Sequence, residues 1–515
     1  MNAAQSLLRP ALEWGYGSHA ALIFHDRTYS YDEVARAINR AGNALREFGI
    51  APDDRVLIML RDSPDFIFCY LGAIKIGAVA VAVNLRASPS DLLFYLRDTQ
   101  AKVFVLERAF IESYCTIERE LDTPPHLIVI DDASSNADSW AARFARQPPD
   151  LDAVERASDD MAFWIYTSGT SGTAKAAVHL QKDVLNAGDH LGGVLGVRVG
   201  ERLFATSKLF FAYALGNALF GGFRLAATVI LLDEWPKPEL VTQIIERHRP
   251  HVVFAVPTIY RNLLEAGVAA GASLRQVRHY VSAGERLPES LWQRWRQATG
   301  CEIVDGMGTS ETVYMLLTNY PGMVRPGSSG KPAPGVEAKL ADADGRPTPP
   351  GEPGILWARI ASRAARYWDQ PEKSRAAFRG EWFCTGDMYR IDGDGYWFHE
   401  GRHDDLLKIS GQWVSPAEIE ELLLAELPLR EAIVVGTVDA DGLMRLTLFA
   451  VGPDGEFEPA ALERRIMALL TERLSVYKCP KWIRFIDAIP RTATGKVLRF
   501  LLRQRAEALL KGEAA

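Results

Sequence analysis

Residues 163–180 read FWIYTSGTSGTAKAAVHL: an apolar run, a loop of small hydroxyl residues and glycines, and a second apolar run. The first run predicts a buried strand that stops where the loop begins. Gly169 and Gly172 allow backbone N–H groups to turn toward a bound anion. Further hydrogen-bond donors are the hydroxyl groups of Thr167, Ser168, Thr170, Ser171 and Thr173. The stretch therefore predicts a phosphate-binding loop between two apolar strands.

Two other interpretations of this loop are weaker. The common NTPase phosphate loop has Lys directly after Gly and then Ser or Thr, whereas Ala174 precedes Lys175 here and Ala176 follows it. An isolated run of Gly, Ser and Thr is most often a flexible surface turn. The flanking apolar runs, and the motifs further along the chain, favour a functional loop over such a turn.

Composition and charge restrict the class of protein. With 515 residues, 48% of them hydrophobic and 24% charged, the chain is long enough for two or more domains. Its net charge of -7 argues against nucleic-acid binding and against a basic membrane-binding surface. The five cysteines lack the spacing of zinc sites or disulfide frameworks, so we expect reduced thiols.

Targeting signals are not recognisable in the sequence. Arg9 and Pro10 interrupt the first apolar stretch, which also lacks the basic start of a signal peptide. No apolar run approaches the roughly 20 residues that a bilayer span needs. We therefore expect a cytoplasmic protein that binds neither nucleic acid nor membranes.

Short apolar runs alternate with helical periodicity in the N-terminal part. Ser30 and Glu33 have the pattern of a capping box, apolar residues then recur at helical spacing as far as Phe48, and Gly49 follows where a C-terminal cap belongs. Further helices are predicted over 64–76 and 88–98, and strands over 56–60, 78–83 and 103–106. This alternation is typical of an α/β domain with a largely parallel sheet.

The middle of the chain continues this alternation after an interruption. Residues 133–160 are polar and acidic, and we interpret them as a connector between two α/β lobes. Beyond the loop, helices are predicted over 184–195 and 240–247, and a strand over 252–256. No short repeat is present, so a solenoid is not expected, although two similar α/β halves stay an alternative.

A new compact unit is predicted to begin near residue 404. Ser415 stands as an N-cap, Pro416 occupies the first helical position, and Glu418 completes a second capping-box pattern. We expect a large, multi-lobed α/β domain over residues 1–403 and a small α+β domain over residues 404–515.

A second glycine-rich segment, DGMGTSE at residues 305–311, ends in a carboxylate. Gly306 and Gly308 predict a tight turn there. A carboxylate beside such a turn can hold Mg²⁺, which usually takes only one or two protein oxygens. Most acidic turns of this kind are solvated loops, so the segment is a weak signal by itself.

Three later segments each carry one charged residue of interest. WFCTGD ends at Asp387, a GR pair ends at Arg402, and PRTATGK ends at Lys496. Taken singly, Asp387 would be a turn residue, and Arg402 and Lys496 exposed cations. The order of phosphate loop, glutamate, aspartate, arginine and terminal lysine is hard to obtain by chance.

In this order the segments resemble the motifs of adenylate-forming enzymes, the superfamily of acyl-CoA synthetases, luciferases and peptide-synthetase adenylation domains. Three positions depart from the family pattern. Ala174 replaces a proline of the loop, Met307 replaces a tyrosine, and Ser310 replaces a threonine. A thioether can still cover an adenine ring, and serine keeps the hydroxyl group.

The resemblance implies a role for each motif. It implies catalytic roles for Lys496, Glu311, Thr170 and Lys175, with Mg²⁺ on Glu311 and Thr170. By this resemblance, the Asp387 carboxylate would accept hydrogen bonds from both ribose hydroxyl groups, and Arg402 would contact phosphate and ribose. The implied nucleotide-binding residues are Thr167, Ser168, Gly169, Ser171, Gly172, Gly284, Glu285, Asp305, Gly306, Met307, Gly308, Ser310, Asp387 and Arg402.

The last motif implies a mobile domain. An ammonium group that such a domain delivers can neutralise charge between a carboxylate and the α-phosphate, which is the role expected of Lys496. Asp404 matches the hinge aspartate of the family, at which the small domain rotates between two half-reactions. By the same resemblance, Lys408 and Gly411 are expected beside the tunnel for the pantetheine arm of CoA.

Part of the resemblance is narrower and concerns the acid substrate. The segments KLFFAYALGN at 208–217, TNYPG at 318–322 and GQWVSP at 411–416 resemble the benzoate-CoA ligase branch. By burial preference alone the aromatic residues of the first segment would be core residues. The branch resemblance instead implies an aryl pocket lined by Ala212, Tyr213, Leu215, Gly216 and Tyr314.

Tyr314 stands where the benzoate branch is expected to have histidine. Its hydroxyl group and larger volume favour a substituted, heteroaromatic or alicyclic acid over benzoate itself. The resemblance thus implies an ATP-dependent ligase that joins a small aromatic or ring carboxylate to CoA through an acyl adenylate. ATP, Mg²⁺ and CoA are the expected cofactor and co-substrates.

Two alternatives belong to other classes of function. The first is a stand-alone adenylation enzyme that loads a separate carrier protein; no serine-bearing carrier module follows Lys496, so we expect no fused carrier. The second is a non-catalytic protein that keeps only the fold. It would be expected to lack Lys496, Glu311 or Asp387, and all three are present. A homodimer stays open as the assembly.

Overall fold

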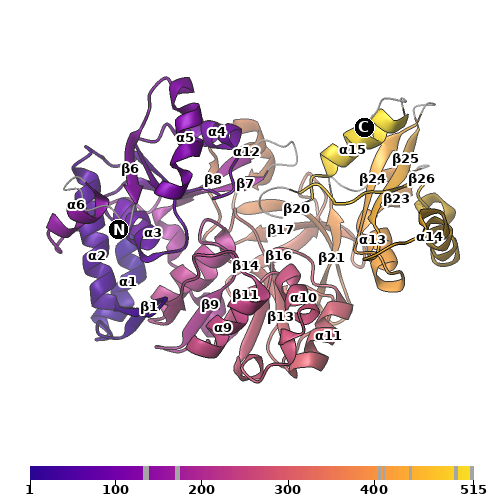
Figure 1. The fold of residues 1–515 in the computed structure, drawn as a ribbon, viewed down its shortest axis with the longest axis horizontal. Helices are drawn as coiled ribbons and strands as arrows, with labels where there is room; N and C mark the ends of the chain where they lie inside the picture. Colours follow the sequence, from indigo (N-terminus) through magenta and orange to yellow (C-terminus); the bar gives the residue numbers. More distant parts are fainter. Residues whose placement is uncertain are drawn as a thin grey trace.

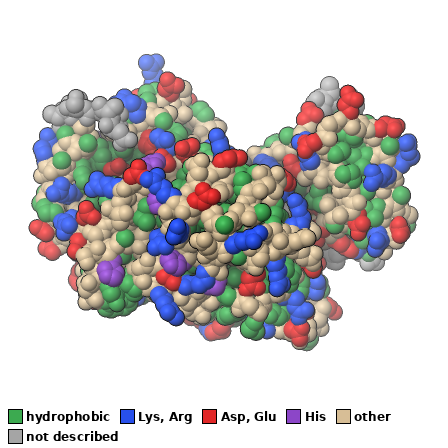
Figure 2. Space-filling model, turned by 60° about the horizontal axis from the view of Figure 1, so that its bottom comes forward, with side chains coloured by type: hydrophobic (Ala, Val, Ile, Leu, Met, Phe, Trp, Pro, Cys, Tyr) green, Lys and Arg blue, Asp and Glu red, His purple; other side chains and the backbone are tan. Residues whose placement is uncertain are grey.

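The structure is a computed structural model that describes residues 1–130, 139–168, 174–403, 407–409, 412–439, 443–491 and 497–510. A large N-terminal α/β part carries a small α+β domain at one end (Figure 1). In Figure 2 a notch separates the two, and acidic and basic side chains are interspersed over the visible face. None of the described helices combines the length and apolar character of a membrane span.

The first sheet of the large part has seven strands in the order β18-β8-β7-β4-β3-β5-β6. Its strands are β3 (Arg55–Met59), β4 (Val79–Ala82), β5 (Val103–Glu107), β6 (His126–Ile130), β7 (Met161–Ser168), β8 (Ala174–Leu180) and β18 (Arg366–Tyr367). Strands β3 to β7 run parallel, as the alternating sequence pattern predicted. Strand β8 returns antiparallel beside β7, so the glycine-rich loop joins two neighbouring strands.

The expected connector between lobes is wrong. Strand β7 pairs with β4, so the chain returns after residue 160 to the sheet that it had already formed. Within the range 133–160 the described residues also include a helix, α6 (Trp140–Arg146), whose N-cap Ser139 accepts a hydrogen bond from Ala142 N. The described residues of this range, Trp140 apart, lie at or near the surface, which explains their polar composition without a domain boundary.

The second sheet has nine strands in the order β15-β14-β13-β12-β11-β9-β10-β1-β2. They are β1 (Ala20–Phe24), β2 (Arg27–Ser30), β9 (Arg202–Ala205), β10 (Thr228–Ile230), β11 (Val252–Ala255), β12 (His279–Ser282), β13 (Ile303–Gly308), β14 (Met315–Thr318) and β15 (Lys331–Pro332). The N-terminal strand β1 pairs with β10, so the two sheets share the chain and are not consecutive halves.

A third, antiparallel sheet follows. It contains β16 (Glu337–Ala341), β17 (Gly354–Arg359), β19 (Phe378–Arg379), β20 (Trp382–Ile391) and β21 (Trp397–Arg402). The helices of the large part are α1 (Ala3–Glu13), α2 (Tyr31–Arg46), α3 (Pro64–Lys75), α4 (Pro89–Thr99), α5 (Ile111–Ile117), α6, α7 (Asp189–Gly193), α8 (Gly221–Arg224), α9 (Pro238–His248), α10 (Pro257–Glu265), α11 (Glu289–Thr299) and α12 (Pro371–Ala377). Between α7 and α8 lies η4 (Tyr213–Phe220), a π-helical segment.

Local sequence signals explain where α2 and α7 begin and end. The capping box of α2 is confirmed: Ser30 Oγ accepts from Glu33 N at 3.2 Å, and Glu33 Oε2 accepts from Ser30 N at 2.7 Å. The helix predicted over 184–195 is wrong in length, because Val184 ends a short 3₁₀-helix (Gln181–Val184) and the only α-helix in this range is α7. Gly188 adopts a φ of +93°, a left-handed conformation that ends any helix arriving from Val184.

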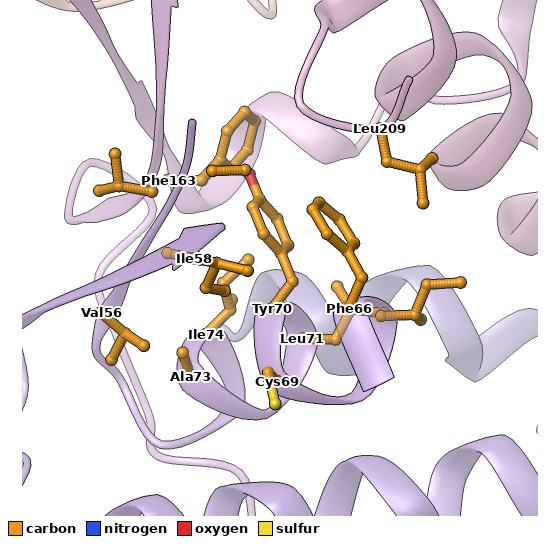
Figure 3. Packing of buried hydrophobic residues seen from close by; sticks show 14 of the residues in the cluster. Val56, Ile58, Phe66, Cys69, Tyr70, Leu71, Ala73, Ile74, Phe163 and Leu209 are labelled. Carbon is orange, nitrogen blue, oxygen red and sulfur yellow. The ribbon is translucent and has the colours of Figure 1, made fainter. Parts of the chain in front are cut away.

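The core of the large part forms around α3, which is buried on all sides. Figure 3 shows Phe66 and Tyr70 of this helix among side chains of neighbouring elements, including Ile58 and Phe163. A helix that is apolar all round is expected in such a place and not at a surface. All five cysteines are free, and burial raises the pKa of the Cys69 thiol, which disfavours its reactive thiolate form.

The small domain has its own core. Its strands are β22 (Leu407–Ile409), β23 (Gln412–Val414), β24 (Glu431–Val438), β25 (Met444–Val451) and β26 (Trp482–Phe485), and its helices are α13 (Pro416–Glu426), α14 (Pro459–Arg473) and α15 (Arg499–Leu510). The boundary at residues 403 and 404 stays a prediction, since residues 404–406 lie outside the described residues. Arg286 of the large part forms an ion pair with Glu421 of α13.

The capping box predicted for α13 is wrong. Ser415 is the N-cap residue, but its hydroxyl group donates to Glu400 O at 2.7 Å and makes no cap hydrogen bond. Glu418 instead pairs with Lys478 at 2.6 Å. Both side chains therefore bind tertiary partners in place of the helix cap. Ser415 bonds to the large part, and Glu418 pairs with the segment between α14 and β26.

Candidate active site

The hairpin of β7 and β8 brings the predicted phosphate loop to the end of the first sheet. Thr167 pairs with Lys175, and Ser168 with Ala174, across the two strands. The loop residues Gly169, Thr170, Ser171, Gly172 and Thr173 lie outside the described residues. Their contacts with phosphate stay predictions.

Lys175, Tyr367 and Glu311 form a hydrogen-bonded row beside the loop. Lys175 Nζ donates to Tyr367 Oη at 2.8 Å, and Tyr367 Oη donates to Glu311 Oε1 at 2.7 Å. Lys175 Nζ lies 3.5 Å from Glu311 Oε1. Burial lowers the pKa of Lys175 despite the opposing effect of the Glu311 charge. The structure thus joins two of the predicted catalytic residues through a phenol that the sequence analysis missed.

Tyr367 reaches this position through long-range strand pairing. It lies on β18, which pairs with β8 so that Tyr367 faces Ala177 across the sheet. Burial and the neighbouring Glu311 carboxylate raise its pKa, so the phenol stays protonated. Nothing in its local sequence, ARYWDQ, distinguishes it from a core tyrosine.

The tight turn predicted at Gly306 and Gly308 is wrong, because both glycines lie within β13. They are required by the close approach of β14: a Cβ on Gly306 would lie 2.5 Å from Leu317 O, and one on Gly308 would lie 2.8 Å from Tyr314 O. The chain turns only after Gly308, and this places Glu311 at the end of the hairpin.

Two further groups hold the Glu311 turn in place. His179 of β8 is completely buried, and its Nε2 lies 2.9 Å from Ser310 O. Its Nδ1 lies 3.0 Å from Asp183 Oδ2. Val313 has a φ of +65°, a rare conformation for a β-branched residue that the surrounding packing must enforce. Backbone strain of this kind is often found at functional sites.

Asp387 and Arg402 face each other across β20 and β21. Arg402 Nη1 lies 3.4 Å from Asp387 Oδ2 and donates to Thr385 O at 2.8 Å. His399, which the sequence analysis did not single out, places Nε2 3.3 Å from Asp387 Oδ1. After burial and Glu311, the next effect on the pKa of Lys175 is the charge of Arg402, which lowers it. These two predicted residues therefore belong to the same site as Lys175.

Asp305 and its neighbours are the residues predicted to surround the adenine base of the nucleotide. Asp305 is buried, burial raises its pKa well above the ordinary value, and its Oδ1 has no hydrogen-bond partner among the described residues. Such an orphaned acceptor suits an exocyclic amine of the kind that adenine carries. Gly284 has a φ of +89°. Glu285 accepts hydrogen bonds from the backbone N–H and the hydroxyl group of Thr258. Met307 is half-buried.

The residues predicted to line an aryl pocket lie in η4, at its N-cap Ala212 and in the turn before β14, and their role in binding an acid stays a prediction. Tyr213 Oη donates to Val281 O at 3.0 Å, while Ala212 and Leu215 are buried. A Cβ on Gly216 would lie 2.7 Å from Val313 O, so glycine allows η4 to pack against the strained turn. Tyr314 is buried in the same place. The structure brings these predicted residues together.

The small domain carries the remaining predictions. Asp404, Gly411 and Lys496 lie outside the described residues, and the side chain of Lys408 is not described either. Lys408 pairs through its backbone with Trp413 in the β22–β23 hairpin. Their roles in hinge motion, CoA binding and catalysis stay predictions.

The fold and the site define a two-domain enzyme that activates a substrate with a nucleotide. The AMP-binding enzyme family matches residues 14–368, and the C-terminal domain of AMP-binding enzymes matches residues 418–496. The chain therefore belongs to the AMP-binding, adenylate-forming enzymes, as the sequence motifs indicated.

Curated relatives cover nearly the whole chain. It is 42% identical to the 3-hydroxybenzoate–CoA ligase of Aromatoleum sp. (strain CIB), over 99% of this chain and 97% of that protein. It is 43% identical to the 3-hydroxybenzoate–CoA/4-hydroxybenzoate–CoA ligase of Thauera aromatica, over 99% and 98%. A benzoate–CoA ligase of the same organism is 39% identical, over 98% and 95%.

Solved structures agree with this assignment. The anthranilate CoA ligase AuaEII, in complex with anthranoyl-AMP, superimposes with a TM-score of 0.89 at 35% identity, covering 99% of this chain and 98% of that one. A benzoate CoA ligase from Burkholderia xenovorans LB400 gives a TM-score of 0.88 at 33% identity, covering 98% and 100%.

Proposed function

We propose that this protein is an AMP-forming acid-CoA ligase that activates a small aromatic carboxylate as its acyl adenylate and transfers it to CoA. Full-length similarity to hydroxybenzoate-CoA and benzoate-CoA ligases supports the reaction class. The observation that carries the proposal is the convergence of Lys175, Glu311 and the Asp387–Arg402 pair at one place. A cytoplasmic location is part of the proposal.

In the first half-reaction a carboxylate oxygen of the acid attacks the α-phosphorus of ATP, and pyrophosphate leaves. The loop residues, among them Thr170, together with Lys175, would hold the phosphates, while Asp387 and Arg402 would fix the ribose. Asp305 and Met307 would hold and cover the adenine. Lys496 would approach from the small domain and reduce the repulsion between the carboxylate and the phosphate. Positioning and charge account for the catalysis.

Glu311 and Thr170 are the residues proposed to hold Mg²⁺. No group of three or more His, Cys, Asp or Glu side chains in the described part of the chain is arranged as a metal site. A buried carboxylate such as Glu311 fits Mg²⁺, which commonly uses one or two protein carboxylates together with phosphate oxygens and water. When bound, Mg²⁺ supplies positive charge against the phosphate oxygens.

In the second half-reaction the CoA thiol attacks the acyl carbon and AMP leaves. We propose that rotation at Asp404 withdraws Lys496 and brings Lys408 and Gly411 beside the path of the pantetheine arm. The named relatives are CoA ligases, so the alternative of carrier-protein loading has no support among them. A homodimer stays a prediction.

A panel of acids tests the proposal. AMP and pyrophosphate release are measured with ATP, with and without CoA and EDTA, for benzoate, its hydroxy, amino and methyl derivatives, cyclohexanecarboxylate, furoate and straight-chain acids. We expect an aryl-CoA thioester, identified by mass, and loss of pyrophosphate release in EDTA. Pyrophosphate exchange without any thioester would instead support loading of a carrier protein.

A further inference from the structure

A small cavity lies behind Tyr314, at the edge of the proposed aryl pocket. Asn186 and residues 188–191 line one side of it, Asn217 of η4 lines another, and Tyr314 and Met315 close the side toward β14. It holds about 10 Å³ of free space, which is room for one water-sized group. Tyr314 belongs both to this cavity and to the proposed pocket for the acid, so a group in the cavity can be part of a bound acid.

Three of the side chains that line this cavity carry buried polar atoms without a hydrogen-bond partner among the described residues. They are Asn186 Oδ1, His190 Nδ1 and Tyr314 Oη. Buried polar atoms in native proteins are nearly always paired, because an unpaired one keeps its full desolvation cost. Three residues that carry such atoms line one small space, and from this we infer that a polar group occupies it when the site is in use.

The chemistry of His190 is fixed by its neighbours. Its Nε2 lies 3.0 Å from Thr318 Oγ1, and the Thr318 hydroxyl group donates its only proton to Asn319 O at 2.8 Å. Thr318 Oγ1 must therefore accept a hydrogen bond from the Nε2–H group of His190, which places the proton of the neutral ring on Nε2. Burial lowers the pKa of His190 to about 4, so the ring is neutral at physiological pH. Its Nδ1 is then a bare lone pair that requires a donor.

Tyr314 offers the complementary group. Burial raises the pKa of its phenol well above the ordinary value, so it keeps its proton and can donate. A hydroxyl group in the cavity can donate to His190 Nδ1 and accept from Tyr314 Oη at once. An aromatic amine can donate but accepts poorly, since its lone pair is delocalised into the ring. A methyl group or a hydrogen atom satisfies neither partner.

We propose that the cavity between α7 and β14 is a subsite for a hydroxyl group on the ring of the substrate, with His190 as hydrogen-bond acceptor and Tyr314 as donor. This inference rests on the proposed function and names its substrate class as hydroxylated aromatic acids. His190 and Tyr314 determine specificity and take no part in bond making. Asn186 provides a second acceptor at the wall of the cavity.

Expected selectivity follows from the two hydrogen bonds. An unsatisfied buried polar group costs about 1–3 kcal/mol, so kcat/KM for the best hydroxybenzoate should exceed that for benzoate by roughly 5-fold to 150-fold. The methyl derivative at the same ring position should be no better than benzoate. The preferred ring position is the one that brings the hydroxyl group into the cavity, which comparison of the 2-, 3- and 4-hydroxy acids identifies.

The experiment measures kcat/KM for thioester formation with these acids in the wild-type protein and in His190→Phe, Tyr314→Phe and Tyr280→Phe. Tyr280 is a matched control, because its hydroxyl group donates to Leu274 O in a separate core. We expect the hydroxybenzoate-to-benzoate ratio to fall about tenfold or more in the first two variants and to stay unchanged in the control.

The outcomes separate the subsite from the proposed function. If kcat/KM for benzoate equals that for every hydroxybenzoate, the subsite is refuted but the ligase function is not. The cavity would then hold water. Unchanged ratios in both folded variants, as judged by thermal melting, also overturn it. The comparison of acids in the wild-type protein requires no variant, so it stays a valid test even if a variant fails to fold. Absence of a thioester with any aryl acid overturns the proposed function itself.

Discussion

Removal of the Tyr367 hydroxyl group is the most direct test of how the site is held together. Tyr367→Phe deletes the atom that accepts from Lys175 Nζ at 2.8 Å and donates to Glu311 Oε1 at 2.7 Å, and leaves the ring in place. Both partners are charged, and hydrogen bonds to charged groups contribute about 1.5–3 kcal/mol each.

Part of this loss can be recovered. Lys175 Nζ and Glu311 Oε1 lie only 3.5 Å apart, so the two can close into a direct ion pair once the hydroxyl group is gone. We therefore count a net loss of one such bond, about 1.5–3 kcal/mol, which corresponds to roughly 10- to 150-fold in rate. The loss should fall on adenylation, because Lys175 and Glu311 are then displaced from their positions toward phosphate.

The assay compares the two half-reactions. ATP–pyrophosphate exchange measures adenylation, and thioester formation from supplied acyl adenylate measures the second step. In Tyr367→Phe we expect exchange to fall within the stated range, while the second step stays within about threefold of wild type. Tyr280→Phe, which also removes a buried hydroxyl group, should leave both rates unchanged. Exchange within twofold of wild type in a folded Tyr367→Phe protein would refute the positioning role of Tyr367.

Three further predictions concern Lys496 and Gly411, the packing of β13 and the pH dependence of stability. Lys496→Ala should abolish adenylation but spare thioester formation from supplied acyl adenylate, and Gly411→Leu should do the reverse; equal loss in both half-reactions would count against the two-state scheme. Gly306→Ala should lower stability by about 1–3 kcal/mol, because the new Cβ meets Leu317 O at 2.5 Å, whereas Gly393→Ala, with no atom within 4 Å, should be neutral in thermal melting. The unfolded chain binds a proton at His190 below its ordinary pKa of 6.5, whereas burial lowers the folded pKa to about 4, so this residue makes stability rise with pH across that window. Between pH 4 and pH 6.5 the free energy of unfolding, measured with denaturant, should rise by up to about 3 kcal/mol more in wild type than in His190→Asn. An identical pH dependence in the two proteins would contradict the assignment.

Features with a local cause were predictable from the sequence. The capping box of Ser30 and Glu33 forms as predicted, since both of its hydrogen bonds join residues three apart. The parallel strands β3, β4 and β5 follow from short apolar runs separated by helical periodicity. The strands on either side of the glycine-rich segment, β7 and β8, form as the two apolar runs predicted, whereas phosphate binding by the segment stays a prediction.

Other features depended on contacts between distant parts of the chain. The DGMGTSE glycines lie within a strand because β14 approaches its backbone, which no pattern within the segment reveals. The Ser415 capping box failed because Glu400 O competes for the serine hydroxyl group. Tyr367 enters the site only through the pairing of β18 with β8.

The sequence by itself determined the family, the reaction class and the order of the motifs, because short segments carry those signals. Only the tertiary structure decided which charges meet. Lys175 and Glu311 are 136 positions apart in the sequence yet lie 3.5 Å apart in space. The Nδ1 atom of His190, which has no partner in the described part of the chain, is likewise recognisable as an acceptor only when Thr318 and Asn319 are in place. Hydrogen-bond satisfaction is a property of three-dimensional surroundings, so no sequence motif can encode it alone.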